Sequence, residues 1–163
     1  AYYTYKEHAW DEAFGYWGAV SHGLGLSAKQ NYDITKMKDM AAADQNKDGV
    51  VDLKSEYNFA HAYYASSFDR SGKTNYYNTV TQAFLDGRKT IAGAKGEKLS
   101  SSEKAELQGH IAVINANWEK VIAESVFKYA GSVYKDIVKL EENYSDKAFY
   151  TYAKHWGELK GFA

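Results

Sequence analysis

Oxygen-bearing side chains alternate along the segment 44–56, in a spacing typical of a site for a hard cation. The residues at loop positions 1, 3, 5 and 9 are Asp44, Asn46, Asp48 and Asp52. Gly49 at position 6 permits the sharp turn that such a loop requires. A hard dication takes six to eight oxygen ligands, which alternate residues of a tight loop can direct to one point. The pattern predicts an EF-hand-like Ca²⁺ loop in which Val50 supplies a backbone carbonyl and Asp52 acts through water.

The end of this loop departs from the EF-hand pattern. Position 12 is Ser55, and the expected bidentate carboxylate comes one residue later, as Glu56. We expect Glu56 to close the site, because a hydroxyl would leave it short of negative charge. The alternative is an ordinary solvated turn, since Asp, Asn and Gly are common in turns. The predicted ligand set is Asp44, Asn46, Asp48, Val50, Asp52 and Glu56.

Histidine and glutamate pairs form a second constellation near the two ends of the chain. His8 and Glu12 are four residues apart, and His155 and Glu158 are three apart, so each pair shares one helix face. Each pair is either a structural hydrogen bond or part of a metal site. The surrounding pattern Trp-x-Glu-x-x-Gly-aromatic occurs at both ends, either as one packing solution used twice or as a duplicated bundle. Both interpretations place its Trp, Glu and Gly positions in the interior.

Composition restricts the function classes. The chain has 163 residues, 45% hydrophobic and 25% charged, with a net charge near −1. We therefore expect one compact helical domain at 1–163 and do not expect nucleic acid as a partner. No apolar stretch approaches the roughly 20 residues that span a bilayer. The absence of cysteine excludes thiolate metal sites and cysteine nucleophiles, and the absence of proline favours long helices.

The elements that would position these residues are all helical. Apolar residues recur every three or four positions, and no alternating strand pattern stands out. Ser100 and Glu103 form a capping box in front of a very long apolar stripe. The sequence predicts an all-α bundle of about six helices, at 3–20, 34–42, 53–68, 76–94, 100–143 and from the cap at 144–146 to about 160.

Four segments of the chain resemble an imelysin-like family of extracytoplasmic bacterial helical domains. They are His8-Ala-Trp-Asp-Glu-Ala-Phe-Gly-Tyr, the acidic loop 44–56, Gly109-His-Ile-Ala-Val-Ile-Asn-Ala-Asn-Trp-Glu119 and His155-Trp-Gly-Glu-Leu-Lys-Gly-Phe162. The chain is similar to the central and C-terminal part of these longer domains. The resemblance implies a helical bundle, export from the cytoplasm and a link to iron or haem acquisition.

Two functions follow as expectations. The first is an exported or cell-surface calcium-binding helical domain, a non-enzymatic module that binds an unknown protein or small ligand. The alternative is a metal-dependent enzyme or metal carrier that uses His8, Glu12, His155 and Glu158. The resemblance implies this alternative, because His155-Trp-Gly-Glu158 matches the His-x-x-Glu motif that the family associates with metallopeptidase activity. The pair His8 and Glu12 has one extra residue.

Overall fold

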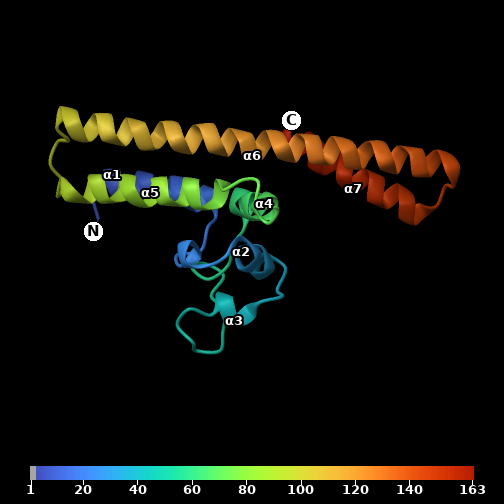
Figure 1. Cartoon of the computed structure of the whole chain (residues 1–163), viewed down its shortest axis with the longest axis horizontal. Helices are drawn as coiled ribbons and strands as arrows, with labels where there is room; N and C mark the ends of the chain where they lie inside the picture. Colours follow the sequence, from blue (N-terminus) through green and yellow to red (C-terminus); the bar gives the residue numbers. More distant parts are fainter. Residues whose placement is uncertain (1–2) are drawn as a thin grey trace. The chain divides into compact units, whose positions relative to one another are not determined.

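The computed structural model describes residues 3–163, and all regular elements in this part of the chain are helices (Figure 1). The α-helices are α1 (Tyr5–Trp17), α2 (Ala28–Thr35), α3 (Met40–Ala43), α4 (Ala60–Asp69), α5 (Tyr76–Gly93), α6 (Ser101–Glu142) and α7 (Asp146–Phe162), and a 3-10 turn, η1, covers Gly23–Gly25. The prediction of an all-α helical bundle is confirmed. None of the described helices is long and apolar enough to cross a membrane.

Two compact units divide the chain, Ala1–Trp118 and Glu119–Ala163. Helix α6 contributes its first part to the first unit and its remainder to the second. The single domain expected at 1–163 stays a prediction.

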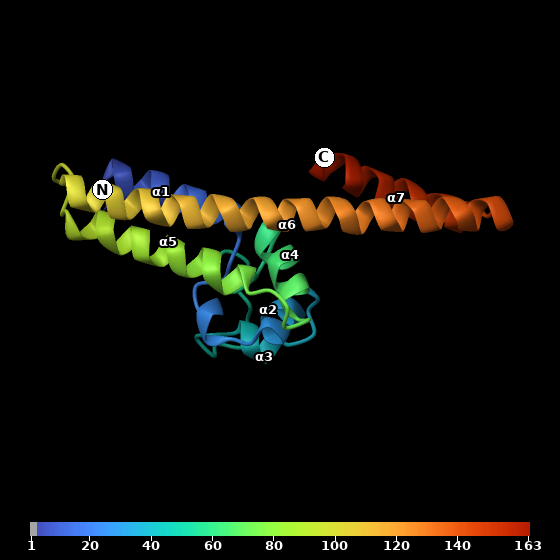
Figure 2. The same ribbon diagram turned by 45° about the horizontal axis from the view of Figure 1, so that its top comes forward.

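Helices α1 and α5 lie side by side in the first unit (Figures 1 and 2). The indole N–H of Trp10 donates to the backbone carbonyl of Phe84 at 2.8 Å. Two turns further along α1, the fully buried Trp17 donates to the Thr81 hydroxyl at 3.0 Å. Gly87 of α5 makes the close approach possible, because a Cβ there would lie 2.2 Å from the Trp10 ring. Tryptophan side chains thus fix α1 antiparallel to α5.

A buried polar network joins the connections around α2 and α4. The Asn58 amide group donates to the backbone carbonyl of Asn31 at 2.9 Å, and its oxygen accepts from the Val20 N–H and the Tyr77 hydroxyl, each at 2.8 Å. Asn31, Asn58 and Tyr77 are almost completely buried. Buried amides need partners, and each of these has them. Burial also raises the pKa of the Tyr77 hydroxyl, so this group stays a neutral donor.

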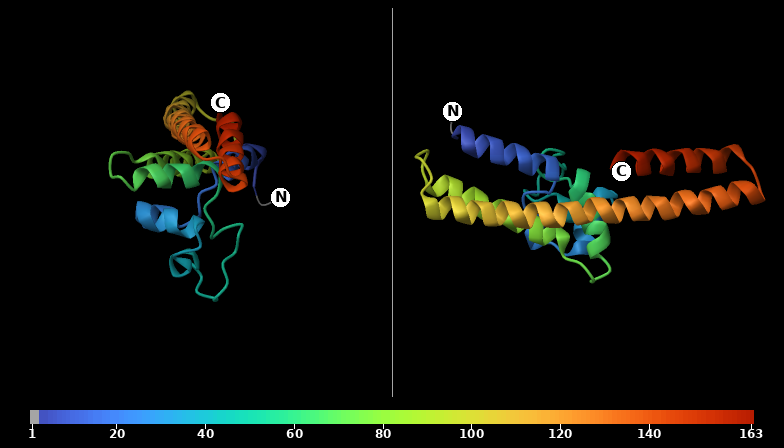
Figure 3. Two further views of the ribbon diagram at one scale, coloured as in Figure 1. Left: turned by 90° about the vertical axis from the view of Figure 1, so that its right-hand side faces the viewer. Right: turned by 90° about the horizontal axis from the view of Figure 1, so that it is seen from above.

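The second unit is a helical hairpin made from the end of α6 and from α7 (Figure 3). The Ser145 hydroxyl caps α7 by accepting from the Ala148 N–H at 3.2 Å. Between the helices, the Tyr129 and Phe162 rings stack at 5.9 Å. Asp136 lies 2.6 Å from Nδ1 of His155. Later residues of α6 therefore meet earlier residues of α7, and the helices run antiparallel.

The predicted boundaries hold in the second half of the chain and fail around the acidic loop. Helices α5, α6 and α7 agree with the segments predicted for them, and the Ser100 capping box is present. The helix predicted at 34–42 is wrong, because α2 begins at Ala28 behind a Ser27 capping box. The helix predicted at 53–68 begins only at Ala60. Glu56 and Asn58 turn into the interior and bond to backbone groups there, which prevents an earlier start.

Candidate functional site

The acidic loop connects α3 to α4 within the first unit. Asp44 ends α3 as its C-cap, and its N–H bonds to the Met40 carbonyl at 3.0 Å. Two of the next residues have positive φ, Lys47 at 60° and Gly49 at 84°. The left-handed conformation of Gly49 agrees with the sharp turn that its position in the pattern predicts.

The first three predicted ligands point their oxygens at the loop backbone. Oδ1 of Asp44 and Oδ1 of Asn46 accept from the same N–H, that of Asp48, at 3.2 and 2.9 Å. Oδ2 of Asp44 accepts from the Gly49 N–H at 2.9 Å. Oδ1 of Asp48 in turn accepts from the Val50 N–H at 2.8 Å. The structure therefore brings Asp44, Asn46 and Asp48 together around one backbone turn.

The donor chemistry of these three residues fits a hard cation. A carboxylate or amide oxygen has two lone pairs, so an oxygen that accepts one N–H can still bind a metal ion. Each of the four oxygens named above accepts one backbone N–H. The N–H of Asp48 is shared between Oδ1 of Asp44 and Oδ1 of Asn46. Within residues 3–163, no group of three or more His, Cys, Asp or Glu side chains is arranged to hold a metal. A calcium ion in this loop would also need the Asn46 amide oxygen and backbone carbonyls as ligands.

Glu56 is the most buried acidic residue of the loop, with 3% of its surface exposed. Its Oε1 accepts from the N–H groups of Gln45 and Asn46 at 3.0 and 3.3 Å, and its Oε2 accepts from the Asp52 N–H at 2.9 Å. Both lone pairs of Oε1 are thus in use, whereas Oε2 retains one. In this arrangement the Glu56 carboxylate closes the loop by bonding to backbone N–H groups of the loop. Ligation of a metal by Glu56 stays a prediction.

Asp52 and Val50, the remaining predicted ligands, have other contacts than the first three. Oδ1 of Asp52 accepts from the Lys54 N–H at 2.9 Å, and its Oδ2 accepts from the Ser55 hydroxyl at 3.0 Å. These two bonds, the backbone one first, lower the pKa of Asp52 below its usual value. The Val50 side chain is 67% exposed. Asp52 therefore caps the turn that leaves the loop, and its water-mediated role stays a prediction.

The terminal histidine and glutamate pairs have other surroundings than the sequence predicts. The His8 ring stacks on Tyr3 at 5.3 Å, and Glu12 is exposed. His155 pairs with Asp136 instead of Glu158. The interior position expected for the repeated pattern is wrong at four of its six members. Glu12, Gly15, Trp156 and Gly161 are exposed, whereas Trp10 and Glu158 are partly buried. The pattern shows helical spacing, but it does not show which face has a neighbour.

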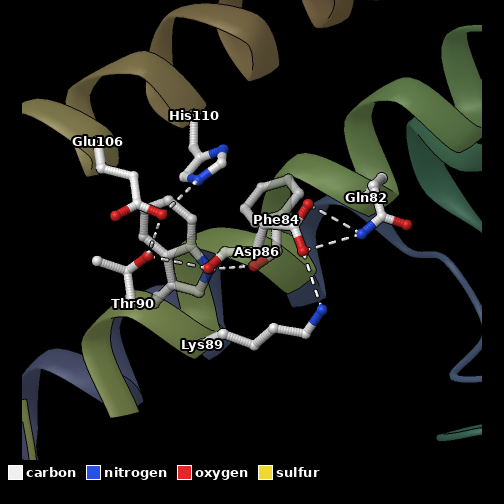
Figure 4. A network of polar contacts seen from close by, with 8 residues as sticks. Gln82, Phe84, Asp86, Lys89, Thr90, Glu106 and His110 are labelled. Carbon is white, nitrogen blue, oxygen red and sulfur yellow. Dashed lines mark hydrogen bonds and ion pairs between the residues drawn. The ribbon is translucent and has the colours of Figure 1, made fainter. Parts of the chain in front are cut away.

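Sequence reasoning also missed a polar cluster between α5 and the start of α6 (Figure 4). The Thr90 hydroxyl donates to Oε1 of Glu106 at 3.2 Å, and Nε2 of His110 lies 3.8 Å from the same oxygen. Asp86 accepts from Gln82 at 2.9 Å and from Lys89 at 3.0 Å, and these bonds lower its pKa. The residues come from two consecutive helices, and Thr90 and Glu106 are 16 positions apart, so the periodicity of one helix could not have shown the cluster.

An apolar cavity of about 260 Å³ lies beside α1 and α5. Its wall includes Trp10, Phe14, Phe84 and Leu24, and Arg88 borders it. Arg88 is held by Glu7 and Asp11, each at 2.8 Å. The cavity is slightly smaller than the roughly 300 Å³ at which small-molecule sites begin, so it suits a small apolar group.

Comparison of the chain with protein-family models, curated proteins and solved structures finds no match. The imelysin-like resemblance therefore stays a prediction.

Proposed function

We propose that the chain is a calcium-binding helical module that acts by binding a partner and not by catalysis. The observation that carries the proposal is the convergence of Asp44 and Asn46 on the N–H of Asp48, in a loop whose positions follow an EF-hand pattern. Asp44, Asn46 and Asp48 would hold the ion with their side chains, Val50 with its carbonyl and Asp52 through water. Glu56 would hold the loop closed and offer Oε2.

The ion would stabilise the junction of several segments in the first unit. The Ser21 N–H donates to the Ser55 carbonyl at 3.3 Å, and the Ser21 hydroxyl contacts the Gln45 side chain at 3.1 Å. Nε2 of His22 lies 2.8 Å from the Ala42 carbonyl. The loop is thus bonded to the segment between α1 and α2, and Glu56 is two residues from the buried Asn58. A bound cation would restrain all of these contacts together.

An extracytoplasmic location is part of the same proposal. Extracellular calcium modules bind with dissociation constants of about 10⁻⁴ to 10⁻³ M, an affinity useful only where calcium is abundant. A loop with an incomplete final ligand fits that affinity class. The resemblance to imelysin-like domains supports export and suggests iron or haem acquisition as the setting. The partner would be a protein or a small ligand.

Thermal unfolding with and without calcium tests the proposal. Saturating CaCl₂ should raise the melting temperature relative to excess EGTA, because a ligand that binds only the folded state adds about 1–3 kcal/mol at 10 to 100 times its dissociation constant. Equimolar MgCl₂ serves as the ion control, and calorimetric titration gives the stoichiometry. An equal melting temperature in calcium and EGTA would refute calcium binding.

A pair of variants locates the site. Asp48→Ala should remove the calcium-dependent rise and leave the melting temperature in EGTA nearly unchanged, since the Asp48 carboxylate is exposed. Ser55→Ala, at the expected position of the closing ligand, should keep the full rise. Equal losses in the two variants would contradict the assigned ligands.

A further inference from the structure

The second unit exposes aromatic and aliphatic side chains along the outer face of α6. Phe127, Tyr134 and Ile137 are 77%, 69% and 40% exposed, and Ala130 is exposed between them. Phe127 and Tyr134 are seven residues apart, as are Ala130 and Ile137. Alternating steps of three and four residues are the spacing of a coiled-coil seam. This stripe of α6 therefore has the pattern of a helix that packs on another helix.

Helix α7 carries a second exposed stripe on the same side of the hairpin. Phe149 and Trp156 are 50% and 48% exposed, and Ala153 between them is exposed as well. On each helix, the stripe is rotated by about a third of a turn around the helix axis from the residues that contact the other helix. Followed from the N-terminus to the C-terminus, the direction of this rotation is the same on both helices. Because α6 and α7 run antiparallel, equal rotations in the same direction place both stripes on the same side of the hairpin. The two stripes together form the apolar face, defined as Phe127, Ala130, Tyr134, Ile137, Phe149, Ala153 and Trp156.

The central positions of the α6 part of the apolar face, 127–134, are complementary to themselves when they are read in the reverse direction. Small residues, Ala130 and Gly131, stand at their centre, and an added Cβ at Gly131 would meet no atom within 4 Å. Phe127 precedes this centre by as many positions as Tyr134 follows it. Lys120 and Glu141, both exposed, flank the stripe at equal distances with opposite charge.

We propose that a second copy of this chain packs antiparallel on the α6 part of the apolar face, with the two-fold axis between Ala130 and Gly131. Phe127 then faces Tyr134 of the partner subunit, and Lys120 faces Glu141 of the partner subunit. The small residues at the axis allow the two α6 helices to approach closely, and the aromatic rings fill the space on either side. A two-fold interface repeats every contact, so each aromatic pair and each ion pair occurs twice.

Charge also favours a second copy as the occupant. Residues 119–163 contain lysines and acidic residues in equal number, so two hairpins do not repel each other strongly. Pairing of the two α6 helices would cover the Phe127 and Tyr134 rings that one copy leaves in water. Large exposed apolar patches of this kind mark interaction sites in soluble proteins.

Sedimentation equilibrium and light scattering of the full chain over a wide concentration range test the proposal. The mass should rise from one chain of 18.3 kDa to two. Gly131→Lys should raise the dimer dissociation constant about tenfold or more, because it places a charge at the two-fold axis. Gly15→Lys is the matched control, since Gly15 is also an exposed helical glycine with open space around it. A monomeric wild type at the highest concentration, or equal dimerisation of the two variants, would overturn the proposal.

Charge reversal and cross-linking test the register. Lys120→Glu should weaken the dimer by roughly threefold to tenfold, and adding Glu141→Lys should restore it. The chain has no native cysteine, so Lys120→Cys and Glu141→Cys copies can be mixed and treated with a bis-maleimide of about 8 Å span, close to the interaxial distance of packed helices. The mixture should cross-link and each variant alone should not, because two copies of position 120 would be about 30 Å apart. Cross-linking of either variant alone, or none in the mixture, would refute this arrangement.

Discussion

The N–H of Gln45 donates to Oε1 of Glu56 at 3.0 Å, which joins the beginning of the acidic loop to its end. The same carboxylate accepts two further backbone N–H groups, those of Asn46 and Asp52. It is almost fully buried, so water cannot replace these bonds. A buried charge is tolerated only when hydrogen bonds compensate it, and Glu56 meets this condition within its own loop. The loop therefore has an internal anchor that is separate from its exposed ligand side chains.

We expect Glu56→Gln to destabilise the first unit in the absence of calcium. The amide replaces one charged acceptor oxygen by an NH₂ group that faces backbone donors, so the free energy of unfolding should fall by about 2–3 kcal/mol. Urea unfolding in EGTA measures the change. Ser55→Ala is the control, because its hydroxyl bonds only to the exposed Asp52 and its loss should cost less than about 0.5 kcal/mol. Equal costs would mean that Glu56 is not the anchor.

Part of this loop could be predicted from sequence because its chemistry is local. The alternation of Asp44, Asn46 and Asp48 with Gly49 specifies a turn, and the structure contains that turn. The environment of Glu56 could not be predicted, since burial depends on segments distant in the chain. For the same reason the sequence predicts a start for α4 that is too early. The sequence predicts Glu56 as a ligand, and the structure shows its carboxylate bonded to three backbone N–H groups of the loop.

Gly87→Ala should destabilise the pairing of α1 with α5. The new methyl group would lie 2.2 Å from the Trp10 ring, so the ring must move and its hydrogen bond to the Phe84 carbonyl must lengthen. Overpacking of this kind costs about 1–3 kcal/mol. Urea unfolding monitored by tryptophan fluorescence measures both the loss of stability and the movement of the ring.

Gly93→Ala provides the control for this substitution. It lies in the same helix with open space around it, so the alanine should stabilise by up to about 1 kcal/mol through helix propensity alone. If both substitutions stabilised the protein, the close approach of Trp10 to α5 would be wrong.

The helices could be predicted better than their partners. The Ser100 capping box and the apolar periodicity identify α6, because both signals lie within a few residues of each other. The contact between Trp10 and Phe84 joins positions 74 apart in the sequence, and no local pattern specifies it. The repeated Trp-x-Glu-x-x-Gly pattern led to a wrong interior assignment for the same reason. Trp10 has α5 beside it, whereas Trp156 is half exposed.

Acidification should destabilise the first unit through His61. Burial lowers the pKa of His61 below its usual 6.5, and a hydrogen bond with the Tyr16 backbone opposes this shift in part. Its ring centroid is 5.3 Å from that of Trp118. The folded state therefore favours the neutral imidazole, and this preference contributes its full stability above about pH 6.5. The contribution is lost as the pH falls through 6.5 toward the folded-state pKa, because the unfolded chain takes up the proton first.

The melting temperature measured between about pH 8 and pH 5.5 tests this expectation, because carboxylates with pKa values near 4 contribute little in that range. The wild type should lose stability toward the acidic end, and His61→Gln should show a flatter profile, since glutamine does not titrate. His8→Gln removes an exposed histidine from α1 and should retain the wild-type slope. Identical slopes for the wild type and His61→Gln would show that another group governs the acid response. A flat profile for His8→Gln would show that His8, and not His61, governs the acid response.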